Sequence, residues 1–366
     1  MAASFDLTAY LNQGTEQLVQ DILKATLRNP KETVFLHRYH AAQQGMEKRH
    51  MSLEAEGRYI PMFLIASISN ACNLFCTGCY ARASGQCGQT CTEPLLDEKQ
   101  WGDIFSQAEE AGIPFILLAG GEPMMRQDVL RVAAEKKSIL FPVFTNGTLI
   151  DGPLLTLLDR HRNLVPVVSL EGSEASTDRR RGDGTYRRAQ AALHSLSDKK
   201  LLFGVSLTVT TENRPEVMSD DFIQSLYQEG CRLVFFIEYV PATPGTEHLA
   251  PDDTERLVIE EAQDVLRARF PGMVFLSFPG DEKHMGGCLA AGQGFFHINA
   301  YGAAEPCPFS PYSDMSLRDH SLLDALNSPF FQLVRDLNAQ GEAHMGGCAL
   351  FEKEAQVKSL LFPQKA

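Results

Sequence analysis

The sequence predicts an α/β fold: a partial barrel of six β/α units, with a helical segment before it and a small α+β domain after it. Two observations predict this architecture. Six short apolar runs recur along the first two thirds of the chain, and helical patterns lie between them. These runs are nearly continuous in Val, Ile, Leu and Phe, which is typical of parallel strands buried on both faces. We therefore divide the chain into a helical segment (1–58), a barrel (59–241) and a linker helix with a C-terminal domain (242–366).

The N-terminal segment is predicted to be helical from about residue 5 to residue 58. Leu11, Leu18 and Leu23 recur at helical spacing, and a second, more polar amphipathic run covers residues 31–56. The Asn29-Pro30 step separates the two runs, because proline disfavours a helical conformation in the residue before it.

The barrel elements follow in order. The predicted strands cover 62–69, 114–120, 139–146, 164–172, 201–210 and 232–240, and the helices between them lie near 98–111, 127–136, 152–159, 186–196 and 214–229. Beyond the linker at 241–253 we expect a helix near 253–269, a Gly-, Cys- and Pro-rich segment over 270–312 and a last helical part over 321–363. Parallel barrels carry their chemistry at the carboxyl ends of the strands, so we expect the site in the loops that follow them.

Three cysteines follow the first predicted strand, in the spacing Cys72-x3-Cys76-x2-Cys79. Three thiolates in one loop can hold three irons of a 4Fe–4S cube. Such clusters normally take four cysteines, so the fourth iron would be open to another ligand. A zinc site would need a fourth ligand nearby and usually contains a C-x2-C pair, which this spacing fits poorly.

With a predicted strand before it and Gly120-Gly121-Glu122-Pro123 about forty residues after it, this loop resembles that of the radical S-adenosylmethionine (SAM) superfamily. The resemblance implies a partial (βα)6 radical SAM barrel. It also implies that the open iron chelates the amino and carboxylate groups of SAM. Reductive cleavage of SAM would then give a 5′-deoxyadenosyl radical, which abstracts hydrogen from a substrate.

The resemblance also implies roles for residues at the strand ends. Gly120, Gly121 and Glu122 would meet the SAM amino group, and Tyr80 would lie near the adenine. A plain β-to-α turn is the alternative for the glycine pair, and a core aromatic packing the loop is the alternative for Tyr80. Either assignment accounts for the residue types.

After the fourth strand, Ser169-Leu170-Glu171-Gly172 and the Asp178-to-Gly182 stretch resemble a signature of family members that carry a C-terminal iron–sulfur extension. Ser169 and Glu171 would hydrogen-bond the SAM ribose, and Arg181 would pair with the SAM carboxylate. The neighbouring arginines, 179 and 180, are alternatives for this role, and one of the three is expected to face solvent.

The spacing Cys288-x13-Gly302-x4-Cys307, with a hairpin turn predicted near 299–302, resembles the start of a SPASM/Twitch extension, and Cys348 would be a third ligand. The resemblance implies one auxiliary 4Fe–4S cluster. Its fourth ligand stays open. The iron could bind substrate, the thiols could be buried without metal, or the ligand could be one of His284, His344, Asp281, Glu282, Cys87 and Cys91.

Composition excludes some classes of function. A net charge of −13 without a basic face disfavours a nucleic-acid backbone as the main partner. No stretch reaches eighteen uninterrupted apolar residues, so we expect no membrane insertion, and the N-terminus lacks the pattern of a signal peptide. Nine cysteines together with an iron–sulfur motif favour the reducing cytoplasm.

We therefore expect a radical SAM enzyme, with peptide or protein modification as the favoured reaction class. Small-molecule or cofactor biosynthesis is the first alternative, and a non-catalytic iron–sulfur or electron-transfer protein is the second. The resemblance implies three partners: SAM, a reductant such as flavodoxin or ferredoxin, and a peptide or small-molecule substrate.

Overall fold

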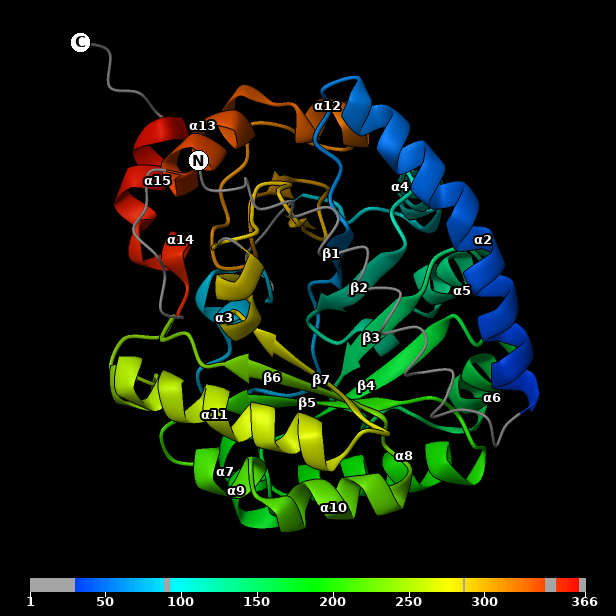
Figure 1. The fold of residues 1–366 in the computed structure, drawn as a ribbon, viewed down its shortest axis with the longest axis vertical. Coiled ribbons are helices and arrows are strands. Elements are labelled where there is room, and N and C mark those ends of the chain that lie inside the picture. The colour runs from blue at the N-terminus through cyan, green and yellow to red at the C-terminus, as the bar shows by residue number, and fades with distance from the viewer. Residues whose placement is uncertain (1–29, 89–92, 286, 340–346, 362–366) are drawn as a thin grey trace.

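The computed structural model describes residues 30–88, 93–285, 287–339 and 347–361, and within them one nine-stranded sheet forms the centre of the molecule (Figure 1). Its strands are β1 (Phe63–Ser69), β2 (Phe115–Gly120), β3 (Phe141–Thr145), β4 (Leu164–Leu170), β5 (Gly204–Val209), β6 (Leu233–Glu238), β7 (Val274–Phe278), β8 (Phe295–Ile298) and β9 (Ala304–Glu305). They are ordered β7-β6-β5-β4-β3-β2-β1-β8-β9, and every neighbouring pair is parallel except β8 with β9. All six predicted strands are confirmed, and so is the α/β fold class.

Helices surround the sheet (Figure 1). They are α2 (Pro30–Ala55), α3 (Tyr80–Ala83), α4 (Glu98–Glu110), η1 (Pro123–Met125), α5 (Gln127–Glu135), α6 (Gly152–Arg160), α7 (Glu174–Arg181), α8 (Thr185–Asp198), α9 (Arg214–Val217), α10 (Asp220–Glu229), η2 (Glu247–Leu249), α11 (Asp253–Arg269), η3 (Gly280–Met285), α12 (Leu322–Leu326), α13 (Pro329–Ala339), α14 (Ala349–Glu352) and α15 (Glu354–Leu361). In the parts of the chain that the structure describes, none of them is long and apolar enough to cross a membrane.

The outer face of the sheet carries the main core. Helices α4 and α5 bury apolar side chains such as Trp101, Phe105 and Leu130 against the strands. Asp97 begins α4 with a reciprocal capping box, in which its side chain accepts a hydrogen bond from the amide of Gln100 at 2.8 Å. Amphipathic helices on buried parallel strands are the arrangement that the sequence pattern predicts.

The segment after residue 241 adds strands at both edges of the sheet that the six predicted strands form. β7 pairs with β6, and β8 pairs with β1. The predicted hairpin is confirmed, because β8 and β9 are antiparallel. β7 was not predicted: it has five residues and lies between Pro271-Gly272 and Pro279-Gly280, which are turn signals. The boundary at 241/242 stays a prediction.

Helix α2 covers the amino ends of the strands (Figure 1). The Tyr39 hydroxyl donates to the carbonyl oxygen of Pro114 at 3.1 Å. The buried carboxylate of Glu32 accepts from Arg162 at 2.6 Å and from the Leu202 amide at 3.0 Å. The second predicted N-terminal helix is thereby confirmed, whereas the first lies outside the described residues. Because α2 covers the amino ends of the strands, we look for the active site at their carboxyl ends.

Candidate active site

The cysteine loop connects β1 to α3 at the carboxyl end of the sheet (Figure 1). Cys72, Cys76 and Cys79 are all unpaired and partly exposed. Arg82 holds the loop in place, because its guanidinium donates to the carbonyl oxygens of Leu74 at 2.6 Å and of Cys72 at 3.4 Å. The first half of the loop is thus fixed by a side chain that follows it in sequence.

Two further contacts define the shape of the loop. The Thr77 amide donates to the carbonyl oxygen of Arg180 at 2.8 Å, which ties the loop to the end of α7. Gly78 has a φ of +67°, and a Cβ there would lie 2.1 Å from the Tyr239 hydroxyl. Only glycine suits such a position. The loop therefore depends on Tyr239, at the end of β6, as well as on its own residues.

Burial raises the pKa of the Cys72 thiol to about 11. The thiol is therefore protonated at neutral pH when no metal is bound, and iron must displace the proton when it binds. Cysteine reactivity with other reagents is correspondingly low at this position. Binding of iron at this thiol would therefore release a proton and depend on pH.

The Gly120-Gly121-Glu122 turn lies directly against the cysteine loop. Gly120 has a φ of +122°, and a Cβ on Gly121 would lie 2.1 Å from the carbonyl oxygen of Ala71. The amides of Gly121 and Glu122 donate to Ser69 at 2.6 Å and to Ala71 at 2.7 Å. The two predicted motifs are thus brought together, and the glycines permit that close approach.

The Glu122 carboxylate is buried and has partners within the protein. One oxygen accepts from the Thr145 hydroxyl at 2.6 Å and from the Met124 amide at 3.0 Å, and the other accepts from the Asn146 amide at 2.8 Å. Burial raises the pKa of Glu122, although these hydrogen bonds oppose the change. The carboxylate that we predicted to meet the SAM amino group therefore also fastens the end of β3.

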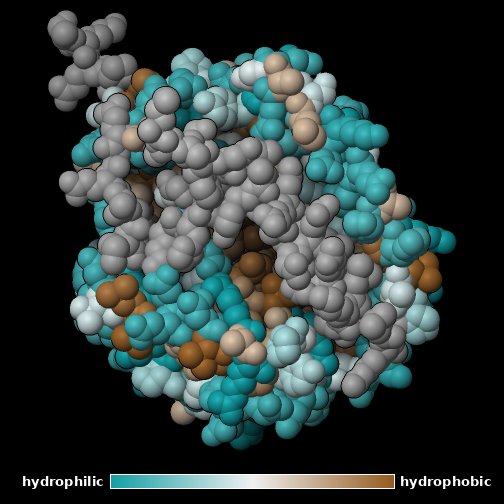
Figure 2. All heavy atoms as spheres, in the orientation of Figure 1, coloured by the Kyte–Doolittle hydropathy of each residue, from teal (hydrophilic) through white to brown (hydrophobic). Residues whose placement is uncertain are grey.

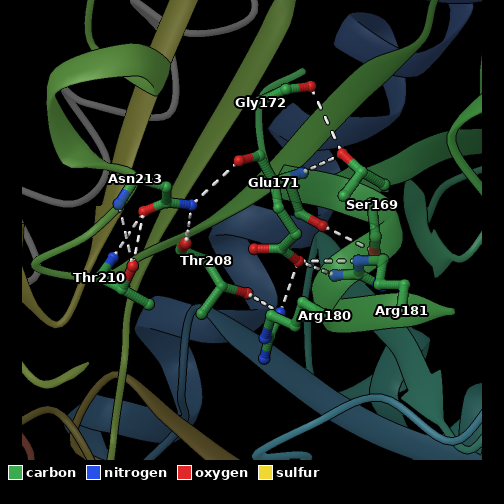
Figure 3. Close-up of polar contacts among 10 residues, drawn as sticks. Ser169, Glu171, Gly172, Arg180, Arg181, Thr208, Thr210 and Asn213 are labelled. Carbon is green, nitrogen blue, oxygen red and sulfur yellow. Dashed lines mark hydrogen bonds and ion pairs between the residues drawn. The ribbon is translucent and has the colours of Figure 1, made fainter. Parts of the chain in front are cut away.

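Glu171 lies between two arginines of α7 (Figure 3). Its carboxylate is 2% exposed, and one oxygen accepts from Arg180 Nη1 at 2.5 Å and from Arg181 Nε at 2.7 Å. Arg180 also donates to the Thr208 hydroxyl at 2.8 Å. The other Glu171 oxygen is buried and has no partner in the described part of the chain. An acceptor left in this way calls for an explanation, and a ligand hydroxyl would supply one.

Neighbouring polar groups hold this arrangement. The Asn213 amide nitrogen donates to the carbonyl oxygens of Glu171 at 3.2 Å and of Thr208 at 2.9 Å (Figure 3). The hydroxyls of Ser169 and Ser206 lie 2.9 Å apart on adjacent strands. We did not predict Thr208, Ser206 or Asn213, because single polar residues at strand ends have no sequence signature.

The three consecutive arginines have different environments. Arg180 and Arg181 both pair with Glu171, whereas Arg179 is exposed and lies 3.4 Å from Glu212. One arginine of the three thus faces solvent, as expected. We predicted that Arg181 binds the SAM carboxylate. In the structure Arg180 and Arg181 both pair with the same Glu171 oxygen.

Tyr80 lies between the two groups of cysteines. Its ring packs on Phe309 with the centroids 5.0 Å apart. Burial raises the pKa of Tyr80, and Cys79 and Cys307 both add to the effect. The predicted role beside the adenine stays a prediction, but the aromatic pair joins the cysteine loop to the C-terminal region.

The three C-terminal cysteines gather from distant parts of the chain. Cys288 follows η3, Cys307 follows β9, and Cys348 precedes α14. Cys307 hydrogen-bonds to Cys348, and the charges of Cys288 and Cys348 both act on it. Near them Glu238, at the end of β6, accepts from Arg256 at 2.6 Å and from the Gly347 amide. Glu238 thus holds Gly347, the residue before Cys348, in place.

The cysteine groups differ from a site for one metal ion. Among the described residues, no three His, Cys, Asp or Glu side chains converge as the ligands of a single ion do. The ligands of an iron–sulfur cube bind different irons, so they surround the cluster at a distance from one another. Two sets of three free cysteines, of which five are partly exposed and Cys307 is buried, fit such clusters.

A chain of buried hydrogen bonds fastens the hairpin to β1. His297 is fully buried, and its ring nitrogens lie 2.7 Å from the Ser67 hydroxyl and 2.7 Å from Glu305. Gln86 donates to the same Glu305 carboxylate at 2.8 Å. The sequence offered no ligand spacing for this histidine, and the structure gives it the role of joining β8 to the barrel beside Cys307.

Residues 66–220 match the family model of the radical SAM superfamily. This span includes the cysteine loop, the glycine turn and the Glu171 network. The chain carries a radical SAM domain over these residues. Members of this superfamily are enzymes that use SAM and a 4Fe–4S cluster, so the predictions of family, enzyme class and cofactors are confirmed.

The chain is similar in sequence to synthases and to a maturase. The AdoMet-dependent heme synthase of Methanosarcina barkeri is 25% identical over 80% of this chain and 88% of that protein. The mycofactocin maturase MftC of Mycobacterium tuberculosis is 25% identical over 80% of this chain and 76% of that protein. The Fe-coproporphyrin III synthase of M. barkeri is 27% identical, but the match spans only 54% of its length.

The fold has solved counterparts. Streptococcus suis SuiB, crystallised with its precursor peptide SuiA, has a TM-score of 0.63 and 19% identity, covering 84% of this chain and 72% of SuiB. At this identity the likeness concerns the fold alone.

Proposed function

We propose that this radical SAM enzyme oxidises a peptide substrate, and that it holds one auxiliary iron–sulfur cluster on Cys288, Cys307 and Cys348. The observation that carries the proposal is the gathering of these three cysteines beside the carboxyl ends of the strands. Tyr80 and Phe309 lie between them and the loop of Cys72, Cys76 and Cys79.

The residues of the first site have defined tasks in this proposal. Cys72, Cys76 and Cys79 would hold a 4Fe–4S cluster, which when bound would supply the electron for the cleavage of SAM. Gly120 and Gly121 bring backbone acceptors near the SAM amino group. Glu171 binds the ribose through its unpaired oxygen while Arg180 and Arg181 hold the carboxylate in place, as Figure 3 shows for the protein groups. A reductant such as flavodoxin or ferredoxin delivers the electron.

Charge favours a peptide over a tetrapyrrole substrate. A tetrapyrrole such as coproporphyrin carries several carboxylates, which need cationic partners when they are buried. At this end of the sheet Arg180, Arg181 and Arg256 are already paired with the buried Glu171 and Glu238. The protein as a whole carries −13 charges, which suits a neutral or cationic peptide better.

A direct test compares the two substrate classes. The reconstituted enzyme, SAM and dithionite are incubated with a panel of Cys-, Lys- and aromatic-containing peptides, or with iron coproporphyrin III. We expect 5′-deoxyadenosine in all mixtures and a mass loss of hydrogen in a peptide alone. Conversion of the porphyrin would overturn the peptide assignment. Failure to form 5′-deoxyadenosine in the wild type, with no difference from Cys72→Ala, would overturn the assignment of the first site.

A further inference from the structure

The two faces of the sheet differ in how far their side chains are buried. Alternate residues of a strand point to opposite faces, and in β1 to β7 every apolar side chain on the face that packs against the outer helices is buried. On the opposite face several apolar side chains keep part of their surface exposed. They include Phe63, Phe144, Ile237, Val274 and Leu276. We call the space that this second face lines the barrel interior.

Aromatic contacts close the barrel interior at the side. Five strands lie between β7 and β1, so in a flat sheet six spacings of about 4.8 Å would separate them. The Phe278 ring of β7 nevertheless packs on Phe63 of β1 and on Phe295 of β8, with centroids 5.8 Å and 6.4 Å away. The sheet therefore curves round until its two sides meet.

The barrel interior has one blocked end. Leu36 and Tyr39 of α2 pack against its apolar residues at the amino ends of the strands. Figure 2 shows a hollow at the centre of the face that is viewed, and the residues visible in the hollow are hydrophobic. A side chain of a ligand could enter such a space and would meet apolar surface there.

The barrel interior has no charged lining. Within β1 to β7, all of which the structure describes, no residue on this face is Asp, Glu, Lys, Arg or His. The polar residues on it already have partners. The Ser169 and Ser206 hydroxyls lie 2.9 Å apart, and the Thr208 hydroxyl accepts from Arg180 at 2.8 Å. A charged ligand group would lose its water here without gaining a counter-ion, whereas an apolar group would be stabilised by burial.

The apolar lining begins next to the first site. Ile237 pairs in register with Thr208 on one side and with Phe278 on the other. Thr208 accepts from Arg180, which also pairs with Glu171, the residue that we assign to the SAM ribose. Ile237 is thus one strand away from this polar network. A group held against Ile237 would lie beside the place where the radical is formed.

We propose that the barrel interior binds a neutral, apolar side chain of the peptide substrate, and that Ile237 and Phe144 determine this specificity. The proposal rests on the proposed function, peptide oxidation, and narrows its substrate class. The C–H bond that breaks belongs to the bound side chain. Its hydrogen atom forms a new C–H bond at the 5′ carbon, which gives 5′-deoxyadenosine and leaves the unpaired electron on the side chain.

The test follows deuterium from the peptide into 5′-deoxyadenosine. The full chain is reconstituted and incubated with SAM, dithionite and short peptides of random sequence, in four pools. Each pool is deuterated in the side chain of one residue type, which is Val, Phe, Lys or Glu. Mass spectrometry of the 5′-deoxyadenosine shows which residue type supplies the hydrogen.

Three variants accompany the wild type. Ile237→Asp places a carboxylate in the barrel interior, and Ile237→Ala enlarges the interior without adding a charge. Val265→Asp is the matched control, because it makes a similar change on α11, where Val265 is 58% exposed.

We expect the wild type to take deuterium from the Val or Phe pool and not from the Lys or Glu pool. Ile237→Asp should lower this transfer by about 10-fold, because its carboxylate lies unpaired among apolar groups, and Val265→Asp should leave it unchanged. Ile237→Ala should raise the ratio of Phe-derived to Val-derived deuterium, since a larger ring then fits better. This ratio tests the role of Ile237 even if Ile237→Asp does not fold.

Deuterium from the Lys or Glu pool, or from none of the four pools, would overturn this inference and leave peptide oxidation standing. Transfer and ratio unchanged in the Ile237 variants would overturn the role of Ile237. Conversion of iron coproporphyrin III by the same preparation would instead overturn the proposed function.

Discussion

The buried Glu171 carboxylate pairs with arginines through one oxygen, and we propose that its other oxygen binds the SAM ribose. One oxygen accepts from Arg180 and Arg181, and the other remains without a protein partner in the described structure. Sequence could identify Glu171 and Arg181, because both lie in a short motif. The sequence could not show that Arg180 pairs with the same carboxylate. Consecutive arginines on a helix are identical in type, and only the fold determines where each side chain points.

We predict that Glu171→Gln weakens SAM binding by about 10- to 100-fold, because a neutral amide leaves two buried guanidiniums uncompensated. Equilibrium dialysis of the reconstituted protein with labelled SAM measures the effect. Glu174→Gln is the matched control, since Glu174 pairs with Arg187 at the exposed surface, where both side chains are 47% exposed or more. Equal SAM affinity in the two variants, both folded by circular dichroism, would contradict the assigned role.

A second prediction concerns Gly78. Gly78→Ala should remove most of the iron bound by the cysteine loop, because the new Cβ would lie 2.1 Å from the Tyr239 hydroxyl. Gly85→Ala is the control: its φ is +75°, similar to that of Gly78, but nothing lies within 4 Å of a Cβ. Both variants bear the cost of a left-handed alanine, roughly 1 kcal/mol.

The iron content and the visible spectrum of Gly78→Ala and Gly85→Ala test this prediction. Tyr239→Phe in the Gly78→Ala background should recover part of the iron, because it removes the nearest atom, and the Tyr239 hydroxyl is buried without a partner in the described residues. If Gly78→Ala and Gly85→Ala bind equal amounts of iron, close packing against Tyr239 does not shape the loop.

Among the elements, α2 has the least expected position. Its polar sequence indicates a helix, yet it covers the amino ends of the strands with few apolar residues and one buried ion pair. Sequence patterns locate such a helix but not its docking position, because Glu32 and Arg162 are 130 residues apart. The missed strand β7 has a related cause: its flanking Pro and Gly residues indicate turns, and only pairing with β6 shows that it is a strand.

At this scale we predict that Arg162→Met lowers the free energy of unfolding by about 3 kcal/mol, because Glu32 is then buried without its cation. Chemical denaturation of the apoprotein measures the change. Adding Glu32→Leu should recover most of the loss, since two apolar groups replace the pair. The surface pair of Lys31 and Asp159 provides the control, and Lys31→Ala should cost less than about 1 kcal/mol. Equal losses in the two single variants would contradict the role of α2 as a docked cap.

At the scale of the whole molecule, two sets of three cysteines lie in segments that connect the elements around one sheet. The hairpin of β8 and β9 pairs with β1, the strand that leads into the first cysteine loop. His297 links Ser67 of β1 to Glu305, two residues before Cys307. The sequence predicted both sets of cysteines from their spacing. It could not predict that the hairpin joins the barrel sheet, because that contact spans more than 200 residues.

The same limit applies to the three C-terminal cysteines, which come from three separate elements. Their proximity is a property of tertiary structure, whereas the loop of Cys72, Cys76 and Cys79 is local and could be identified from its spacing.

The most direct test of two clusters is iron counting after anaerobic reconstitution, in the wild type and in the Cys72→Ala/Cys76→Ala/Cys79→Ala variant. We predict about eight irons per chain in the wild type and about four in the variant. About four irons falling to none would contradict the account, because the C-terminal cysteines would then be structural thiols without a cluster.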